Sequence, residues 1–209
     1  MIMDEQSRAI SLDVLAESLN LGLGHVIDEL SEISNSRIEL HVPEVNMLPK
    51  KEALAFTEQL RQEGKAIFVQ QRFSGEICGE ALLFFSERES LNLLNGLLGE
   101  QEQTLIEFAV TEEEMLLDLT NVAVSGVIYA LSQLLGIQIH TELPRCEYGN
   151  FSDLNDSGRL LDEADDLILF LTISFTVVEK NSRAQLMFFQ PTDALVTLFD
   201  HIKKRLAAF

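Results

Sequence analysis

The 209-residue sequence contains two related copies of one unit. Sliding the chain by 101 positions places identical residues on one another: Asn20 on Asn121, Val26 and Ile27 on Val127 and Ile128, Leu30 and Ser31 on Leu131 and Ser132, and Pro43 on Pro144. A slide of 104 positions aligns residues 82–85 with 186–189, so a small insertion separates the two registers. Such a repeat favours a fold built from two equivalent units.

Hydrophobic periodicity gives both halves the same order of elements. Apolar spacings of three, four and seven predict one long helix over 12–33 and another over about 112–135. Strands are predicted over 36–45, 65–74 and 77–86 in the first half and over 136–144, 165–180 and 182–190 in the second. Helices over 50–62, over 90–99 and after Pro191 complete a duplicated α-β-β-β-α unit.

The two units are expected to form one α+β domain over residues 1–209. Its pseudo-repeats cover about 7–100 and 108–209, and the acidic stretch 100–113 is predicted to connect them. Each half supplies apolar strands, so the simplest arrangement is one shared antiparallel sheet. Two long helices would flank this sheet with pseudo-twofold symmetry.

The charge balance excludes several classes of partner. Fifteen basic residues against 34 acidic residues give a net charge of −19, and this field opposes binding to nucleic acid or to an anionic membrane. The longest apolar run, residues 167–178, is shorter than the roughly 20 residues that span a bilayer. Cys78 and Cys146 lie far apart without metal-site spacing, which fits a reduced compartment. We therefore expect a soluble, cytoplasmic, monomeric protein.

Each long helix carries a carboxylate, a second carboxylate and an amide at positions i, i+4 and i+7. These residues are Asp13, Glu17 and Asn20 in the first half and Glu114, Asp118 and Asn121 in the second. At about 100° per residue, this spacing confines each trio to one narrow stripe of its helix. In both halves 22 residues separate the asparagine from a proline, Pro43 or Pro144.

This pattern resembles the signature of the CheC/CheX/FliY family of bacterial chemotaxis phosphatases. That signature is Asp or Ser, three residues, Glu, two residues, Asn, 22 residues, Pro. The first half matches it in full, whereas the second has Glu114 in place of Asp or Ser and Asp118 in place of Glu. Two copies in a chain of this length look most like CheC, and the resemblance covers essentially the whole sequence.

The resemblance implies hydrolysis of the aspartyl phosphate on a CheY-like response regulator. Asn20 and Asn121 would each position the attacking water, and Glu17 would contact a lysine of the regulator, a role that Asp118 would fill with a shorter reach. Mg²⁺ is expected on the regulator, so no metal or cofactor is expected on this chain. Because the second motif departs from the signature, we expect its site to be weaker.

Other interpretations of these residues are available. A polar stripe on an amphipathic helix is most often a solvated face, although its recurrence at matched positions argues against that reading. The same helices could bind a receiver domain or a flagellar switch component without hydrolysis, or bind a CheD-like deamidase.

The remaining candidates are weaker. The four histidines lack metal-site spacing, and Ser125 lacks the context of a nucleophile elbow. Gly22 and Gly24 are interpreted as a point where the first helix packs closely against its neighbour.

Overall fold

The structure is a computed structural model that describes residues 5–40, 44–49, 51–52, 55, 66–86, 88–89, 92, 105–149, 167–178, 182–190 and 192–206. Its helices are α1 (Glu5–Gly22), α2 (Gly24–Ser34), α5 (Leu105–Leu135) and α7 (Thr192–Leu206). The strands of the first half are β1 (Ile38–Leu40), β2 (Glu44–Pro49), β3 (Ala66–Gly75) and β4 (Gly79–Ser86). Those of the second half are β5 (Ile139–Thr141), β6 (Arg145–Gly149), β7 (Leu167–Val177) and β8 (Ser182–Gln190).

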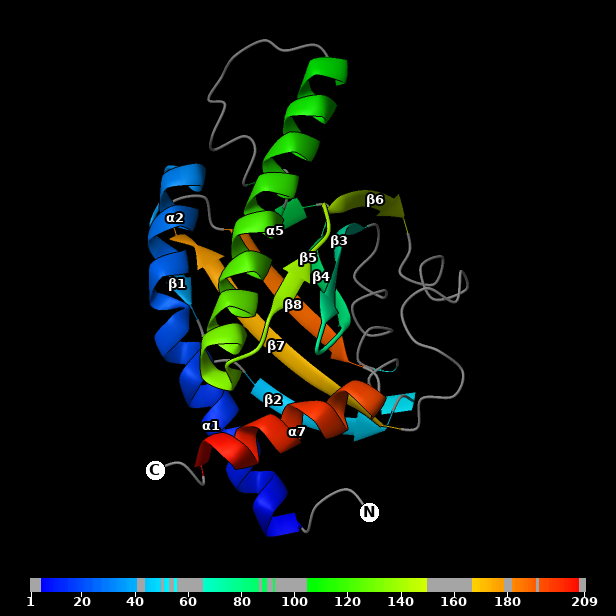
Figure 1. Ribbon diagram of the computed structural model, residues 1–209. Coiled ribbons are helices and arrows are strands. Elements are labelled where there is room, and N and C mark those ends of the chain that lie inside the picture. Colours follow the sequence, from blue (N-terminus) through cyan, green and yellow to red (C-terminus); the bar gives the residue numbers. More distant parts are fainter. Residues whose placement is uncertain are drawn as a thin grey trace.

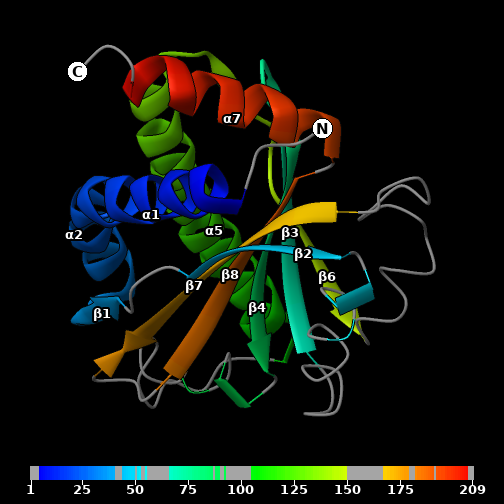
Figure 2. The same ribbon diagram turned by 90° about the horizontal axis from the view of Figure 1, so that it is seen from below.

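All the strands join one eight-stranded antiparallel sheet, which confirms the α+β class (Figure 2). The path through the sheet is β1-β7-β8-β4-β3-β5, with β2 also pairing with β7 and β6 with β3. The hairpins β3–β4 and β7–β8 meet along β4 and β8 in the middle of the sheet. Each hairpin therefore pairs at its outer edge with the two short strands of the other half.

The described residues of each half form four strands, where the sequence predicted three. The predicted strand 36–45 is divided between β1 and β2, and the second half has β6, which sequence reasoning placed outside any strand. Pro144 lies between β5 and β6. Because a proline has no amide hydrogen to donate to a neighbouring strand, it fits this break between two strands. The predicted helices 50–62 and 90–99 lie mostly outside the described residues.

The helices also differ from the prediction at their boundaries. The first helix is divided at Leu23, although the amide of Leu23 still donates to the carbonyl of Leu19 at 2.9 Å. The predicted connector 100–113 is wrong in part, because α5 already begins at Leu105. That helix ends where predicted: Gly136 has a positive φ of 69° and its amide donates to the Ser132 carbonyl, closing the last turn.

A single apolar cluster joins α1, α2, α5 and α7 to one face of the sheet (Figure 1). On β3 and β4 this face presents Ile67, Val69, Phe73, Leu83 and Phe85, all buried. Burying side chains of this size stabilises the fold by about 1.5–3 kcal/mol each. The buried face holds the helices in fixed positions and so fixes what their outer faces present.

The helices α2 and α5 meet at Gly126. A Cβ atom placed there would lie 1.9 Å from the Cγ2 atom of Val26, so only glycine permits this approach. Gly24 has nothing within 4 Å of the equivalent point. The close packing predicted at Gly22 and Gly24 is absent at Gly24, while the surroundings of Gly22 lie outside the described part of the structure. The close approach lies at Gly126 instead, because the buried stripe of α2 runs through Val26 and not through Gly24.

By length and composition alone, residues 113–135 of α5 could cross a membrane. However, 56% of that stretch is buried inside the protein, as in the core helix of a globular domain. Its apolar character is accounted for by packing against α1, α2 and the sheet.

Candidate functional site

The first motif lies on α1 and faces away from the core. Asp13 and Glu17 are exposed and Asn20 is half-buried, while Leu15 and Leu19 of the same helix are buried. Because apolar and polar residues alternate with helical periodicity, packing of the leucines turns the motif outward. These three side chains therefore lie on the outer side of α1.

The second motif has the same arrangement on α5. Glu114, Asp118 and Asn121 are exposed, and Leu116 and Leu119 are buried. Neither asparagine is enclosed in the core, so a visiting molecule can reach both helical faces.

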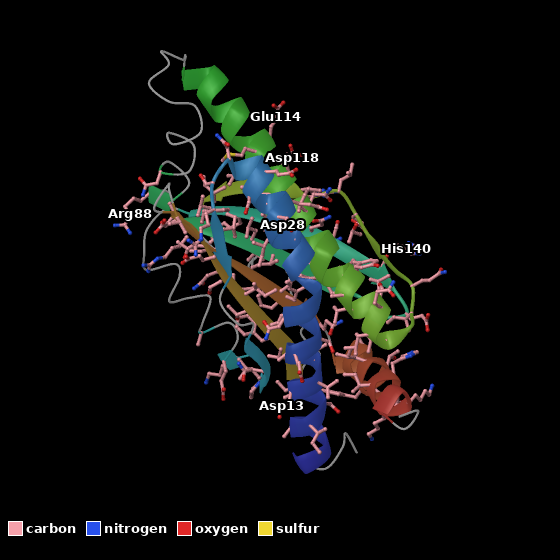
Figure 3. The ribbon with its side chains drawn as sticks, turned by 90° about the vertical axis from the view of Figure 1, so that its left-hand side faces the viewer. Asp13, Asp28, Arg88, Glu114, Asp118 and His140 are labelled. Carbon is pink, nitrogen blue, oxygen red and sulfur yellow. The ribbon has the colours of Figure 1, made fainter. Side chains whose placement is uncertain are left out.

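The structure does not bring the two motifs together into one site. The helices α1 and α5 pack against and cross each other, with α1 rising and α5 descending in the view of Figure 1 (Figures 1 and 2). Asp13 therefore lies toward one end of the helix layer, and Glu114 and Asp118 lie toward the other (Figure 3). The molecule has two separate candidate sites.

Of the two prolines in the motif, the structure describes Pro144. Pro144 is half-buried between β5 and β6, and β5 and β6 both pair with β3. Pro43 lies outside the described residues. The positions of the asparagine and the proline relative to each other are therefore described only for the second half.

A glutamine that sequence reasoning missed contacts the second motif. The Nε2 group of Gln71 donates to the Oδ1 atom of Asn121 at 3.1 Å and to the backbone carbonyl of Glu142 at 2.8 Å. Gln71 is 1% exposed and lies in the row of β3 residues that faces the helices, between Val69 and Phe73. A polar residue on an otherwise apolar strand face is the signal that could have identified it.

A groove of about 460 Å³ runs from Asn121 along the junction of α5 and α2. Tyr129, two turns beyond Asn121, borders it and is 63% exposed. The other residues that line it are Val26, Glu29, Val122, Ser125 and Gly126. A large exposed aromatic residue on the same stripe as the motif is typical of contact surfaces, and the sequence spacing from Asn121 to Tyr129 could have indicated it.

The charged side chains that the structure describes on α1, α2 and α5 all have one sign. Arg8 is the single lysine or arginine in the sequences of α1, α2 and α5. The charged side chains that the structure describes on the three helices are Asp13, Glu17, Asp28, Glu29, Glu32, Glu113, Glu114 and Asp118, all acidic. Like charges on one face raise its negative potential and attract a basic partner surface.

The two histidines whose side chains the structure describes form no comparable site. His140 is exposed, and His201 lies 3.6 Å from the Glu76 carboxylate. The side chains of His25 and His41 lie outside the described part of the structure. Among the described residues, no three His, Cys, Asp or Glu side chains are grouped to hold a metal ion.

Comparison with known proteins gives a consistent result. No protein-family profile matches the chain. The CheY-P phosphatase CheC of Bacillus subtilis is 22% identical over 151 residues, which cover 70% of each chain.

Solved structures share the fold. FliY from Thermotoga maritima matches with a TM-score of 0.66 at 18% identity, over 98% of this chain and all of that one. FliM from H. pylori, in a complex with SpeE, matches with 0.65 at 10% identity over 99% and 100%. CheX from Borrelia burgdorferi, in a complex with CheY, BeF₃ and Mg²⁺, matches with 0.50 at 12% identity over 85% and 95%. The chain is thus similar in sequence to CheC, and it shares its fold with FliY, CheX and FliM.

Proposed function

We propose that this protein hydrolyses the aspartyl phosphate of a CheY-like response regulator in the cytoplasm, with Asn20 and Asn121 each positioning the attacking water. One observation carries the proposal. In each half, two carboxylates and an asparagine share an exposed helical face, in a chain related to the CheY-P phosphatase CheC.

The reaction requires little covalent chemistry from the residues of this chain. Water attacks the phosphorus atom, the regulator's aspartate leaves as a carboxylate, and inorganic phosphate is released. The barrier falls when water is held in line and the charge on the phosphoryl oxygens is compensated. An asparagine amide can hold the water, because it offers both a donor and an acceptor. Mg²⁺ and a lysine would come with the regulator.

The carboxylates would fix the position of the partner. Glu17 would meet the regulator's lysine in a charge-assisted hydrogen bond, and Asp118 would do so from one methylene further back. Asp13 and Glu114 lie one turn before them and add negative charge. The acidic helix layer would therefore draw in a regulator whose docking face is basic.

The two sites would descend from one duplicated unit with pseudo-twofold symmetry. The strand registers support this: β2 places Glu44 opposite Thr172, and β6 places Arg145 opposite Gln70. A shift of 101 positions relates the short strands, and a shift of 102 relates their partners. The pairings of β1 and β5 obey the same relation.

A second function is a binding module without hydrolysis. FliM shares the fold, and the second motif departs from the phosphatase signature at Glu114 and Asp118. In that case the helices would bind a phosphorylated receiver domain or a flagellar switch component and leave the phosphate in place. Binding to a CheD-like deamidase is compatible with the same family.

The decay rate of a phosphorylated CheY-like receiver in Mg²⁺, with and without this protein, tests the proposal. The wild-type protein should accelerate the decay. Replacing both Asn20 and Asn121 by Ala should slow the catalysed decay by about 100-fold, because removal of one preorganised polar group costs roughly 3 kcal/mol of barrier.

Receiver binding serves as the control, because alanine at the two positions leaves the carboxylates and the core leucines in place. The double variant should still bind the phosphorylated receiver. Binding by the wild-type protein without any release of phosphate would select the binding module instead.

A further inference from the structure

We infer that Gln71 is a positioning residue: it fixes the orientation of the Asn121 amide, so that the Nδ2 group faces the partner. The inference rests on the proposed phosphatase function, because it assigns a supporting part to one of the two asparagines. It starts from the two hydrogen bonds that the Nε2 group of Gln71 donates.

The backbone carbonyl of Glu142 sets the orientation of the Gln71 side chain. Its amide donates to the Arg72 carbonyl at 2.8 Å, which fastens this segment to β3. Its own carbonyl can only accept a hydrogen bond, and it lies 2.8 Å from the Nε2 atom of Gln71. The carbonyl therefore determines which end of the Gln71 amide points toward it.

The oriented Gln71 amide in turn sets the orientation of the Asn121 side chain. Nε2 of Gln71 has two hydrogens, and the second faces the Oδ1 atom of Asn121 at 3.1 Å. Because Nε2 can only donate, Asn121 must present its oxygen to Gln71. The Nδ2 group and one lone pair of Oδ1 then remain for a water molecule or a phosphoryl oxygen.

Packing alone does not account for a glutamine at position 71. Its Oε1 atom is buried and has no hydrogen-bond partner among the described residues. An unsatisfied buried carbonyl is unfavourable, and an aliphatic residue would avoid it. The neighbouring positions on this face of β3 are Val69 and Phe73, as expected for a core strand.

The same contact explains the spacing from asparagine to proline in this half. Pro144 follows Glu142 by two residues, and a proline restricts the residue before it to extended conformations. This restriction acts on Leu143, next to the carbonyl that orients Gln71. A proline separated from Asn121 by 22 residues thus helps to hold the segment that supports the asparagine.

In the described residues of the first half, the position that matches Gln71 offers no such support. The shift of 102 positions that relates β3 to β7 places Ile173 at the position that matches Gln71. Ile173 is buried in the core and has no side-chain donor. Orientation of the asparagine by a buried glutamine is therefore specific to the second site.

The test isolates the second site with an Asn20→Ala background. In that background, Gln71→Met keeps the length of the side chain and removes the donor. We expect kcat for receiver dephosphorylation to fall about tenfold, with KM changed less than about twofold, because binding is retained and the orientation of one group is lost.

Three variants make the result specific. Gln70→Met, at a neighbouring position that is also buried but does not contact Asn121, is the matched control and should leave kcat unchanged. In an Asn20→Ala, Asn121→Ala background, Gln71→Met should have no further effect on kcat. Gln71→Glu places an acceptor against the Glu142 carbonyl and should lower kcat at least as much as Gln71→Met.

A measurement without catalysis separates this inference from the proposed function. In wild-type protein the two Nδ2 protons of Asn121 should give one sharp pair of NMR signals, which broaden or shift in Gln71→Met and not in Gln70→Met. Unchanged Asn121 signals, or an unchanged kcat where Asn121→Ala abolishes activity, would overturn the inference and leave the function standing. A wild-type protein that fails to accelerate receiver decay would overturn the function, while the NMR signals would still decide the role of Gln71.

Discussion

The two halves of the molecule support equivalent asparagines in different ways. Around Asn20 the signature is complete, but the matching position in the sheet below is the aliphatic Ile173. Around Asn121 both carboxylate positions have changed, but the side chain is hydrogen-bonded to a buried glutamine. The comparison teaches that a match to a sequence signature and the orientation of a side chain by its surroundings are separate properties. Measurements on matched residues of the two halves can separate them.

The largest expected difference concerns two glycines. Gly126→Ala should lower the free energy of unfolding by about 1–3 kcal/mol, because the added methyl group meets Val26 and forces α2 away from α5. Gly24→Ala should stabilise the protein by up to about 1 kcal/mol, because the site is open and alanine favours a helix. Chemical denaturation measures both variants. Equal effects would mean that the two helices do not meet at Gly126 in solution.

Replacing each asparagine on its own shows how much each site contributes to the rate of receiver dephosphorylation. If they act independently, the total rate is the sum of two contributions, and each variant removes only its own share. Based on the signature, Asn20→Ala should remove more than half of the receiver dephosphorylation rate and Asn121→Ala less than half. Adding Gln71→Met to Asn20→Ala should widen this gap. A greater loss from Asn121→Ala would show that the orientation of the amide outweighs the match to the signature.

Tyr129 and Asp28 fall on one another when the sequence is shifted by 101 positions, and they differ in chemistry. Tyr129 borders the groove beside Asn121, so Tyr129→Ala should raise KM at the second site about threefold to tenfold, as for loss of an aromatic contact. Asp28→Ala should change KM less, and its effect should vanish at high salt because exposed charges are screened. Receiver titrations at two ionic strengths distinguish the cases. An effect of Tyr129→Ala on kcat alone would argue against docking in the groove.

The smallest expected effect is an exchange of carboxylates. Asp118→Glu restores the signature in the second half, and Glu17→Asp copies the departure into the first. Because exposed ion pairs contribute about 0.2–1 kcal/mol, KM should change only about twofold, falling for Asp118→Glu and rising for Glu17→Asp. Changes of the same sign in both variants would show that carboxylate reach does not set the docking contact.

Much of the fold could be predicted because its signals are local. The hairpins β3–β4 and β7–β8 follow from β-prone runs around short turns, and the end of α5 follows from Gly136. The short strands were harder, since three to six residues carry little periodicity. The start of α5 was missed because its first turns are preceded by a polar, acidic stretch that is typical of a connector.

The candidate site was predictable only within each helix. Periodicity was sufficient to place Glu17 with Asn20 and Asp118 with Asn121. The contact between Gln71 and Asn121 joins residues 50 positions apart, and the close approach at Gly126 depends on how α2 crosses α5. Both contacts are set by tertiary packing, which no local pattern records.

The short strands of each half pair with the hairpin of the other half, and this pairing limits where the chain can be divided. Because β1 and β2 complete the hairpin of the second half, and β5 and β6 that of the first, a fragment ending before α5 would leave two sheet edges bare. Such a fragment should aggregate alone and reassemble when its complement is present. A chain nicked between Asn92 and Leu105 should therefore remain one particle, held together by the pairings of β1 and β2 with β7, of β5 and β6 with β3, and of β4 with β8.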